Sequence, residues 1–465
     1  MANNLGKNKI NNSKARVINK KYLDISLQSI IDNIAFSKTD RWAYYRISNS
    51  AYDFLSHHDR IALGEKINRA FTNIMGERQQ PLDCHLIVDS MPVDIDTWRE
   101  QNYEAVKDWD TAPGFDEFMA MQEEHLRAEE YMKKVVVLGV HLGKRGAVDL
   151  DALSVFEGGM KQAFDKAKEA FSTVFALPEI EVKKGEEEYA RNTENEFYQV
   201  LSTGHLKARR CTTEEILLLL KRQLYPAMPA PYLDVDHENR LGPGDIALEI
   251  GHTIRNKFRW LEISQMVGDE EMTGYRATLS FSKFPKSIAY PDSFPFIYFL
   301  DKLGLPFPIF ARFTFHPVSA MKKEIEKKKK ESRDEMENIA NAQDGLDNAI
   351  DGLPPEVAES IGDMNSIREI ISQDKSPWIE GSYHVVVETP NEETLKKYCA
   401  TLKQAYSDLD INVTWTTGDQ AKLFLEQMPG DRVRVTSFDQ ITTVSQLSAS
   451  GMNYSSEVGD RIISR

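Results

Sequence analysis

Strand and helix signals alternate along this chain, and this alternation restricts the fold more than any other feature. The clearest unit has apolar side chains at every second position of 383–387, a helical apolar stripe over 395–409, and a second alternating stretch at 411–415. Segment 42–88 repeats the same strand–helix–strand order. Two such units predict an α+β fold with mixed or antiparallel sheets and split, ferredoxin-like halves.

Two helix starts carry capping motifs. Thr212 and Glu215 have the spacing of a capping box, in which each side chain bonds the other residue's backbone amide. Thr389 has the same spacing to Glu392, with Pro390 at the first helical position. We therefore expect one helix to begin after Thr212 and another after Thr389.

Other segments indicate strands by composition. Residues 135–140 form a continuous apolar run, which is typical of a strand covered on both faces. Residues 259–265 and 274–284 predict two strands of an antiparallel ribbon. Between the strand-rich parts lies a highly charged segment, 319–377, whose interrupted apolar stripe predicts a projecting helical hairpin.

These signals divide the chain into segments. We expect a basic disordered tail, an α+β domain, the charged hairpin, and a strand–helix–strand–helix unit that completes the α+β domain. Their ranges are 1–21, 22–318, 319–377 and 378–430.

Charge and composition exclude several classes of protein. The net charge is −15, but residues 1–21 hold five Lys, one Arg and no acid, so the rest of the chain carries −21. Because nucleic-acid binders usually have a basic domain, direct DNA binding is disfavoured. The tail could contact anionic lipid or an acidic partner, or could be a solvated terminus. No signal peptide or apolar run long enough to span a membrane is present.

Motif searches give no catalytic, cofactor or metal residues. The nearest approach to a phosphate-binding loop is 139–145, where the glycine spacing is one residue short and Arg145 replaces the required Ser or Thr. We interpret this stretch as the glycine-rich end of a buried strand. The sequence also lacks a dinucleotide-binding glycine motif, a nucleophile elbow and a zinc-protease helix, and its three cysteines lie far apart.

Two groups of residues remain as candidate contacts. A basic cluster could bind phosphate or an acidic partner, or could be exposed charge with local ion pairs; its members are Lys207, Arg209 and Arg210. The apolar segment 294–313 and the start of the charged hairpin could form an interface, although burial of 294–313 in the protein's own core is an alternative. The candidate interface residues are Phe294, Phe296, Phe299, Arg312, Lys322 and Lys323.

Several stretches resemble one known family. Residues 294–301, 319–330 and 449–460 are similar to the large conjugation ATPases of type IV secretion systems. Residues 33–37 and 42–46 resemble the start of the Gram-positive conjugative-element branch of that family. The resemblance covers most of the chain.

The resemblance implies that this region docks on membrane-embedded mating-channel proteins and on neighbouring subunits. In that family a C-terminal motor domain binds Mg²⁺ and ATP. Residues 431–465 are then expected to be a linker toward a missing or separate motor, so no catalytic residue is carried over and ATP and Mg²⁺ are expected only there.

We therefore expect a non-catalytic docking and oligomerisation region of a conjugative DNA-transfer ATPase, which self-associates and is peripheral on the inner face of the cell membrane. One alternative is a stand-alone structural adaptor of a secretion or conjugation channel. The other is a nucleic-acid-binding protein, or an enzyme acting on nucleic acid, that uses the cluster at 205–210.

Overall fold

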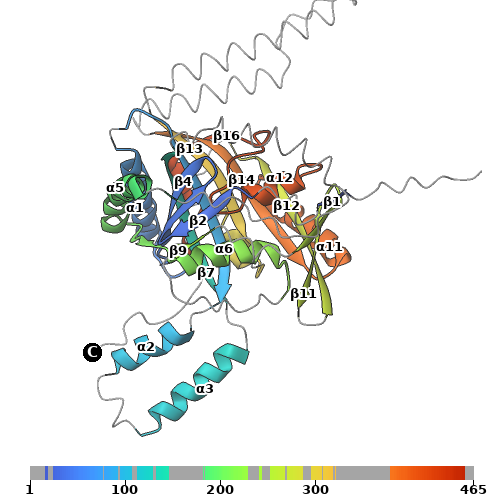
Figure 1. Cartoon of the computed structure of the whole chain (residues 1–465), viewed down its shortest axis with the longest axis horizontal. Coiled ribbons are helices and arrows are strands. Elements are labelled where there is room, and N and C mark those ends of the chain that lie inside the picture. The colour runs from blue at the N-terminus through green and yellow to red at the C-terminus, as the bar shows by residue number, and fades with distance from the viewer. Residues whose placement is uncertain are drawn as a thin grey trace, which may run out of the picture.

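A computed structural model gives the architecture of the chain (Figure 1). It describes residues 16–18, 25–76, 78–92, 95–106, 113–128, 132–145, 182, 184–228, 240–242, 252–267, 270–285, 295–305, 307–317, 320 and 377–455.

A sheet of 15 strands forms the centre of the described structure. Part of it is a ferredoxin-like half, in which the chain order is strand, helix, two strands, helix, strand and the spatial order is β8-β4-β7-β6. All neighbouring strands of this half are antiparallel. Its elements are β4 (Asp40–Ile47), α1 (His57–Met75), β6 (Leu82–Pro92), β7 (Met132–Lys144), α5 (Lys184–Thr203) and β8 (Arg209–Arg210).

A second half repeats this arrangement, with the spatial order β15-β12-β14-β13. The short α8 occupies the place of its first helix. Its elements are β12 (Glu270–Lys283), α8 (Phe299–Lys302), β13 (Ile309–His316), β14 (Trp378–Thr389), α11 (Glu392–Ser407) and β15 (Asn412–Trp415). The α+β class and the ferredoxin-like halves predicted from the sequence are therefore confirmed.

The halves join through their second strands, because β6 and β13 pair antiparallel with Leu86 opposite Ala311. Each half also carries an insertion between its second and third strands, at 93–131 and at 317–377. The first insertion contains α2 (Ile95–Ala105) and α3 (Phe115–Ala128). The helical hairpin predicted at 319–377 falls in the second insertion and lies almost wholly outside the described residues.

The remaining elements extend the sheet or cover it. They are β1 (Arg16–Ile18), β2 (Leu27–Ile31), β3 (Ile34–Ser37), β5 (Ser50–Ala51), α6 (Thr213–Leu224), β9 (Arg240–Leu241), β10 (Thr253–Asn256), β11 (Leu261–Val267), α12 (Gln420–Glu426), β16 (Gln440–Thr443), α13 (Val444–Ala449) and β17 (Tyr454–Ser455). The predicted ribbon is confirmed, since β11 and β12 pair antiparallel. Within the described part of the chain, none of the helices combines the length and apolarity that crossing a bilayer demands.

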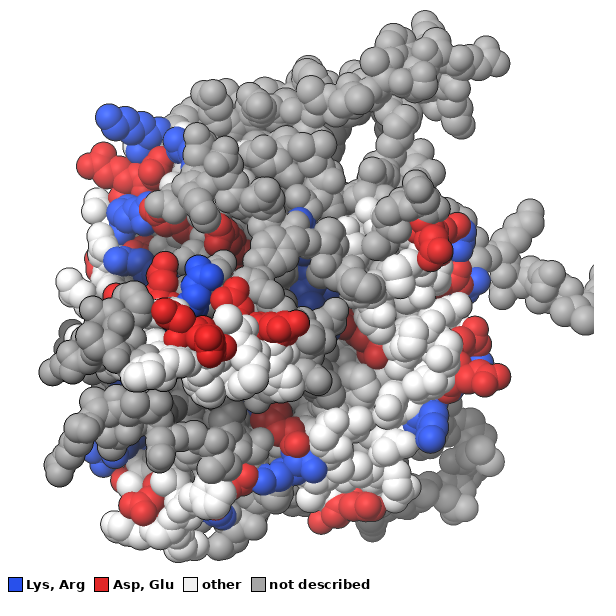
Figure 2. All heavy atoms as spheres, turned by 90° about the horizontal axis from the view of Figure 1, so that it is seen from below, with Lys and Arg blue, Asp and Glu red and all other residues white. Residues whose placement is uncertain are grey.

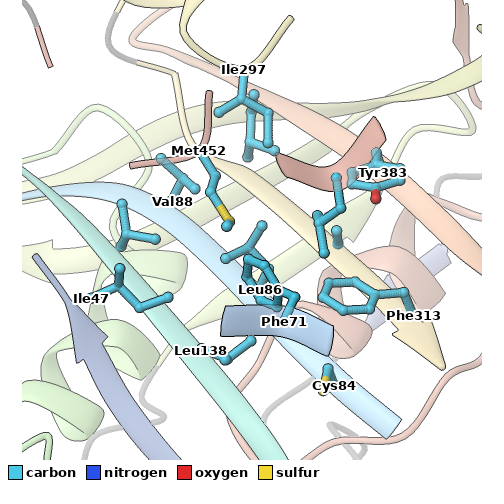
Figure 3. Close-up of a cluster of buried hydrophobic side chains, with 14 of the residues drawn as sticks. Ile47, Phe71, Cys84, Leu86, Val88, Leu138, Ile297, Phe313, Tyr383 and Met452 are labelled. Carbon is cyan, nitrogen blue, oxygen red and sulfur yellow. The ribbon is translucent and has the colours of Figure 1, made fainter. Parts of the chain in front are cut away.

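The sheet is covered on both faces. Side chains of α1, α5, α11 and α13 pack on one face, in a core to which Leu86, Phe313 and Tyr383 contribute (Figure 3). Helices α6 and α12 pack on the other face, where Tyr44, Val137 and Phe424 are buried. Successive residues of a strand point to opposite faces of the sheet, and both faces are covered. The side chains of the central strands must therefore be apolar, or must hydrogen-bond to other groups of the protein, on both faces.

Three details differ from the sequence-based expectations. Residues 431–455 are not a linker: β16 pairs with β14, α13 packs on α1, and Met452 and Tyr454 are buried. Within the predicted disordered tail, residues 16–18 form β1, which pairs with β10. Asn391, not Thr389, caps α11, because Thr389 still pairs in β14 while the Asn391 side chain accepts the Thr394 amide at 2.9 Å.

Candidate functional site

The predicted basic cluster lies at the short strand β8. Lys207 is exposed. Arg210 donates two hydrogen bonds to the buried Glu194 carboxylate, at 2.8 and 2.7 Å, and these raise the pKa of Arg210. Arg209 donates to Glu215 at 2.9 Å. Both arginines thus bind carboxylates of the protein itself, which is the local ion-pair alternative, and phosphate binding by this cluster stays a prediction.

The predicted apolar interface is mostly inside the protein where it is described. Phe296 is buried in the core, and Phe299 packs edge-on against Tyr406 with ring centroids 5.4 Å apart. Arg312 is 2% exposed. These side chains form no exposed patch, so burial in the protein's own core, the alternative considered for this segment, describes them. Phe294, Lys322 and Lys323 lie outside the described residues.

A buried polar row crosses the junction of the two halves on the face covered by α12. Neighbouring strands place Tyr44, Gly139, His85 and Arg312 side by side. The Tyr44 ring lies over Gly139, where a Cβ atom would be 2.6 Å from Tyr44 Cε1. Gly139 is therefore an interior strand residue that admits the tyrosine, as expected for a buried strand and unlike a phosphate-binding loop.

Arg312 connects this row to α12. Its Nε and Nη2 atoms donate to the Glu426 carbonyl at 2.9 and 2.5 Å, and Nη2 also donates to the Met428 carbonyl at 3.2 Å. The guanidinium lies 5.3 Å from the centre of the Trp42 ring. Burial lowers the pKa of Arg312. Cations are favoured at the carbonyl end of a helix, so Arg312 fastens the end of α12 to the sheet.

The Glu426 side chain, in contrast, holds the chain that follows α12. Its Oε2 atom accepts the backbone amides of Arg434 and Val435 at 2.9 and 3.0 Å. Burial raises the pKa of Glu426 to about 7 despite these hydrogen bonds. The folded protein therefore retains a proton on Glu426 that the unfolded chain releases above the ordinary carboxyl pKa of 4.5.

Replacing Glu426 by glutamine should remove a pH dependence of stability. As the pH rises from about 4.5 to 7, the ionisation of Glu426 favours the unfolded state by about 2–3 kcal/mol. Glu426→Gln keeps an oxygen that can accept the two amides, and it cannot ionise. The free energy of unfolding of this variant, relative to that of the natural protein, should therefore increase as the pH rises over this range. Buried His85 and His384, whose pKa values burial lowers, act in the opposite direction in both proteins. Urea unfolding of both proteins at pH 5 and pH 8 measures the difference; a constant difference would contradict the expectation.

A second buried charged cluster lies farther along the same face. Arg276 donates to Glu388 at 3.2 Å and to the Gln223 carbonyl of α6 at 3.2 Å. Arg222 of α6 lies 3.4 Å from Glu388 and 3.9 Å from Asp89. Burial raises the pKa of Asp89 to about 6 and lowers that of Arg276 to about 10. These contacts link α6 to the sheet as the Arg312 contacts link α12.

Neither polar group brings together the parts of a familiar active site. The described residues contain no cluster of three or more His, Cys, Asp or Glu side chains able to hold a metal ion. Cys84, Cys211 and Cys399 are buried, and burial raises the pKa of each thiol, which opposes formation of a nucleophilic thiolate. In the described structure, the contacts of the two polar clusters hold α6 and α12 against the sheet.

The most distinctive surface is the α2–α3 hairpin, which the sequence analysis did not predict. The two helices pack on each other and extend away from the sheet (Figure 1). Tyr103 packs edge-on against Phe115 at 5.3 Å and donates to Asp116 at 2.8 Å, while Arg99 donates to Glu123 at 3.4 Å. These contacts join α2 to α3 and leave the outer side of α3 open.

That open side combines apolar and acidic side chains. Phe118 is 51% exposed and Met121 is 57% exposed, and their spacing of three places them on one side of α3. Insertion 93–131 holds twelve Asp and Glu against three Lys and Arg. Figure 2, viewed from the side of the hairpin, shows Asp and Glu gathered there with fewer Lys and Arg. Phe118 and Met121 are called the hairpin contact pair below.

Comparison with known proteins adds no relative: no protein-family model matches the chain, and no curated protein matches it. The resemblance to conjugation ATPases therefore stays a prediction from the motifs at 294–301, 319–330 and 449–460. The exposed apolar side chains of the hairpin provide evidence for a binding function that does not depend on this resemblance.

Proposed function

We propose that this chain is a docking and oligomerisation region of a conjugative DNA-transfer ATPase, acting without catalysis of its own at the cytoplasmic face of the membrane. The observation that supports docking is the hairpin contact pair, two large apolar side chains on an insertion that extends away from the sheet (Figure 1). The family part of the proposal rests on the resemblance of residues 294–301, 319–330 and 449–460. Exposed aromatic and Met side chains are typical anchors of protein interfaces. The motor and its Mg²⁺ and ATP would be supplied by another segment or another protein.

The charge around the contact pair specifies the partner. Phe118 and Met121 lie among exposed acids of α3, including Asp116, Glu117 and Glu124. A second hairpin would bring like charges together, which disfavours direct hairpin-to-hairpin association. A basic surface with an apolar depression fits better. We therefore infer that the hairpin docks on a positively charged cytoplasmic part of a mating-channel protein, and that self-association uses another surface.

Site-specific cross-linking tests this docking. A photoreactive benzoylphenylalanine at position 118, introduced into the chain in its own host cell, should become covalently joined to a membrane-embedded channel protein. The same residue at Phe54, which is 76% exposed and lies before α1, is the matched control and should give no such product. If position 118 joined only to other copies of the chain, or gave no product, the docking role of the hairpin would be wrong.

Nucleotide binding tests the non-catalytic part of the proposal. Calorimetric titration of the purified chain with Mg²⁺ and ATP should give no saturable heat, since the sequence has no phosphate-binding loop of the required spacing. Saturable binding in the micromolar range would contradict the proposal. It would indicate an ATP site formed without the familiar motif.

A further inference from the structure

An exposed aromatic side chain marks the turn between β10 and β11, which spans residues 257–260. Phe258 at its tip is 64% exposed and has a φ of 73°. Positive φ is disfavoured for a bulky residue, and such strained positions are concentrated at functional sites. The sequence of the turn, Lys-Phe-Arg-Trp, alternates basic and aromatic residues.

Hydrogen bonds hold the turn in this shape, and one of them runs from the Arg259 amide to the Lys257 carbonyl at 2.9 Å. The Phe258 amide donates to the Asn256 side chain at 3.1 Å, and the Phe258 carbonyl accepts the Gly418 amide at 2.8 Å. The Trp415 indole donates to the Arg259 carbonyl at 2.6 Å. The Lys257 amide closes the turn by donating to the Trp260 carbonyl at 2.9 Å. The exposed ring is therefore displayed by a rigid support, which reduces the entropy lost on binding.

Tryptophan and cationic side chains lie in the turn and beside it. Trp260 and Trp415 are half-buried, with centroids 6.4 Å apart and planes inclined at 40°. The exposed Arg259 guanidinium lies 5.6 Å from the centre of the Trp415 ring, and the Lys396 ammonium lies 5.2 Å from that of Trp260. Half-buried tryptophans beside Lys and Arg are typical of protein surfaces at the membrane–water boundary.

The basic N-terminal segment enters the fold beside the same turn. In the pairing of β1 with β10, Arg16 lies opposite Asn256, the residue that precedes the turn. The sequence before Arg16 contains Lys7, Lys9 and Lys14 and no acid. An apolar insertion together with a polybasic segment is a two-component means of attachment to anionic membranes.

We propose that this turn is a lipid-contact site, in which Phe258 enters the headgroup region of an anionic membrane while Arg259 binds lipid phosphate. The inference deepens the proposed function and rests on its location at the membrane face. Single-stranded nucleic acid fits this surface less well, because a stacking platform needs several open rings, whereas Trp260 and Trp415 are half-buried.

Vesicle sedimentation with Phe258→Gly tests the proposal. Glycine accepts the positive φ without strain, so the variant should unfold at the same temperature as the natural protein or a higher one. Partition of the purified full chain onto vesicles of phosphatidylcholine and phosphatidylserine should fall about tenfold. Phe54→Ala, which removes an exposed phenyl ring elsewhere, should leave the partition unchanged. Vesicles of phosphatidylcholine alone should bind the natural protein weakly.

Equal partition of Phe258→Gly and the natural protein would overturn the proposal, as would preference for neutral vesicles. Tight binding of a single-stranded oligonucleotide that Phe258→Gly abolishes, without vesicle binding, would assign the turn to nucleic acid instead. The test is separate from that of the hairpin. A chain that cross-links from position 118 but ignores vesicles would keep its proposed docking role and lose only the lipid site.

Discussion

Replacing Gly381 by alanine should destabilise the protein by about 3 kcal/mol and lower the soluble yield of the folded chain. Gly381 lies in β14, opposite Phe313 of β13 on one side and Gln440 of β16 on the other. A Cβ atom at this position would lie 2.2 Å from the Arg312 carbonyl oxygen and 2.5 Å from Phe313 Cα. Because both obstacles are backbone atoms of a paired strand, β13 and β14 would have to separate at the centre of the sheet. Soluble yield and urea unfolding measure the effect.

Gly185→Ala is the matched control. Gly185 lies in the first turn of α5, and a Cβ atom there would meet nothing within 4 Å. Alanine favours helix over glycine, so this variant should be as stable as the natural protein or slightly more stable. A Gly381→Ala protein that differed from Gly185→Ala by less than about 1 kcal/mol would show that the two strands tolerate the extra methyl group.

The strand–helix–strand units were predictable because their signals are local. In β14 and α11 the periodicity of 2 changes to 3.6 within a few residues, and the capping box at Thr212 needs only four residues. The pairing of β6 with β13 has no such signal, since it joins residues more than 200 positions apart. In β6 the apolar Cys84 and Leu86 flank the polar His85, a pattern typical of a strand with one face in solvent, yet His85 is fully buried.

Neither the buried polar row nor the turn at 257–260 could be predicted, because both depend on contacts between residues far apart in the sequence. A charged Arg312 within an apolar segment is compatible with an exposed interface. Its burial could not be recognised from the sequence, because the carbonyl oxygens that it binds belong to residues more than 110 positions later. The composition of 259–265 predicts a strand that takes in the second half of this turn, whereas β11 begins at Leu261. The one local signal was Asn256, whose side chain can form the turn by accepting an amide two residues on.

Replacing Arg312 by methionine should cost about 3–5 kcal/mol, because it removes the donors from buried carbonyl groups while filling much of the same space. The Glu426 and Met428 carbonyls would be left buried without Arg312, and α12 would lose its attachment to β13. Hydrogen exchange should therefore accelerate in α12 and in the segment that follows it before it does in α1. The free energy of unfolding in urea gives the magnitude, and amide exchange resolved by peptide gives the location.

Arg69→Met separates the loss of a buried cation from the loss of any arginine. Arg69 lies on α1 with its side chain 73% exposed and pairs with Glu65 at 3.5 Å, so its replacement should cost less than about 1 kcal/mol. If Arg312→Met were equally mild, the two hydrogen bonds to the last residue of α12 and the one to Met428 would be replaceable by packing, as is known for some buried ion pairs. A large cost with unchanged exchange in α12 would instead place the contribution of Arg312 in its contact with Trp42. Only a large cost together with faster exchange in α12 agrees with the role assigned to Arg312, which is to fasten the end of that helix to the junction of the two halves.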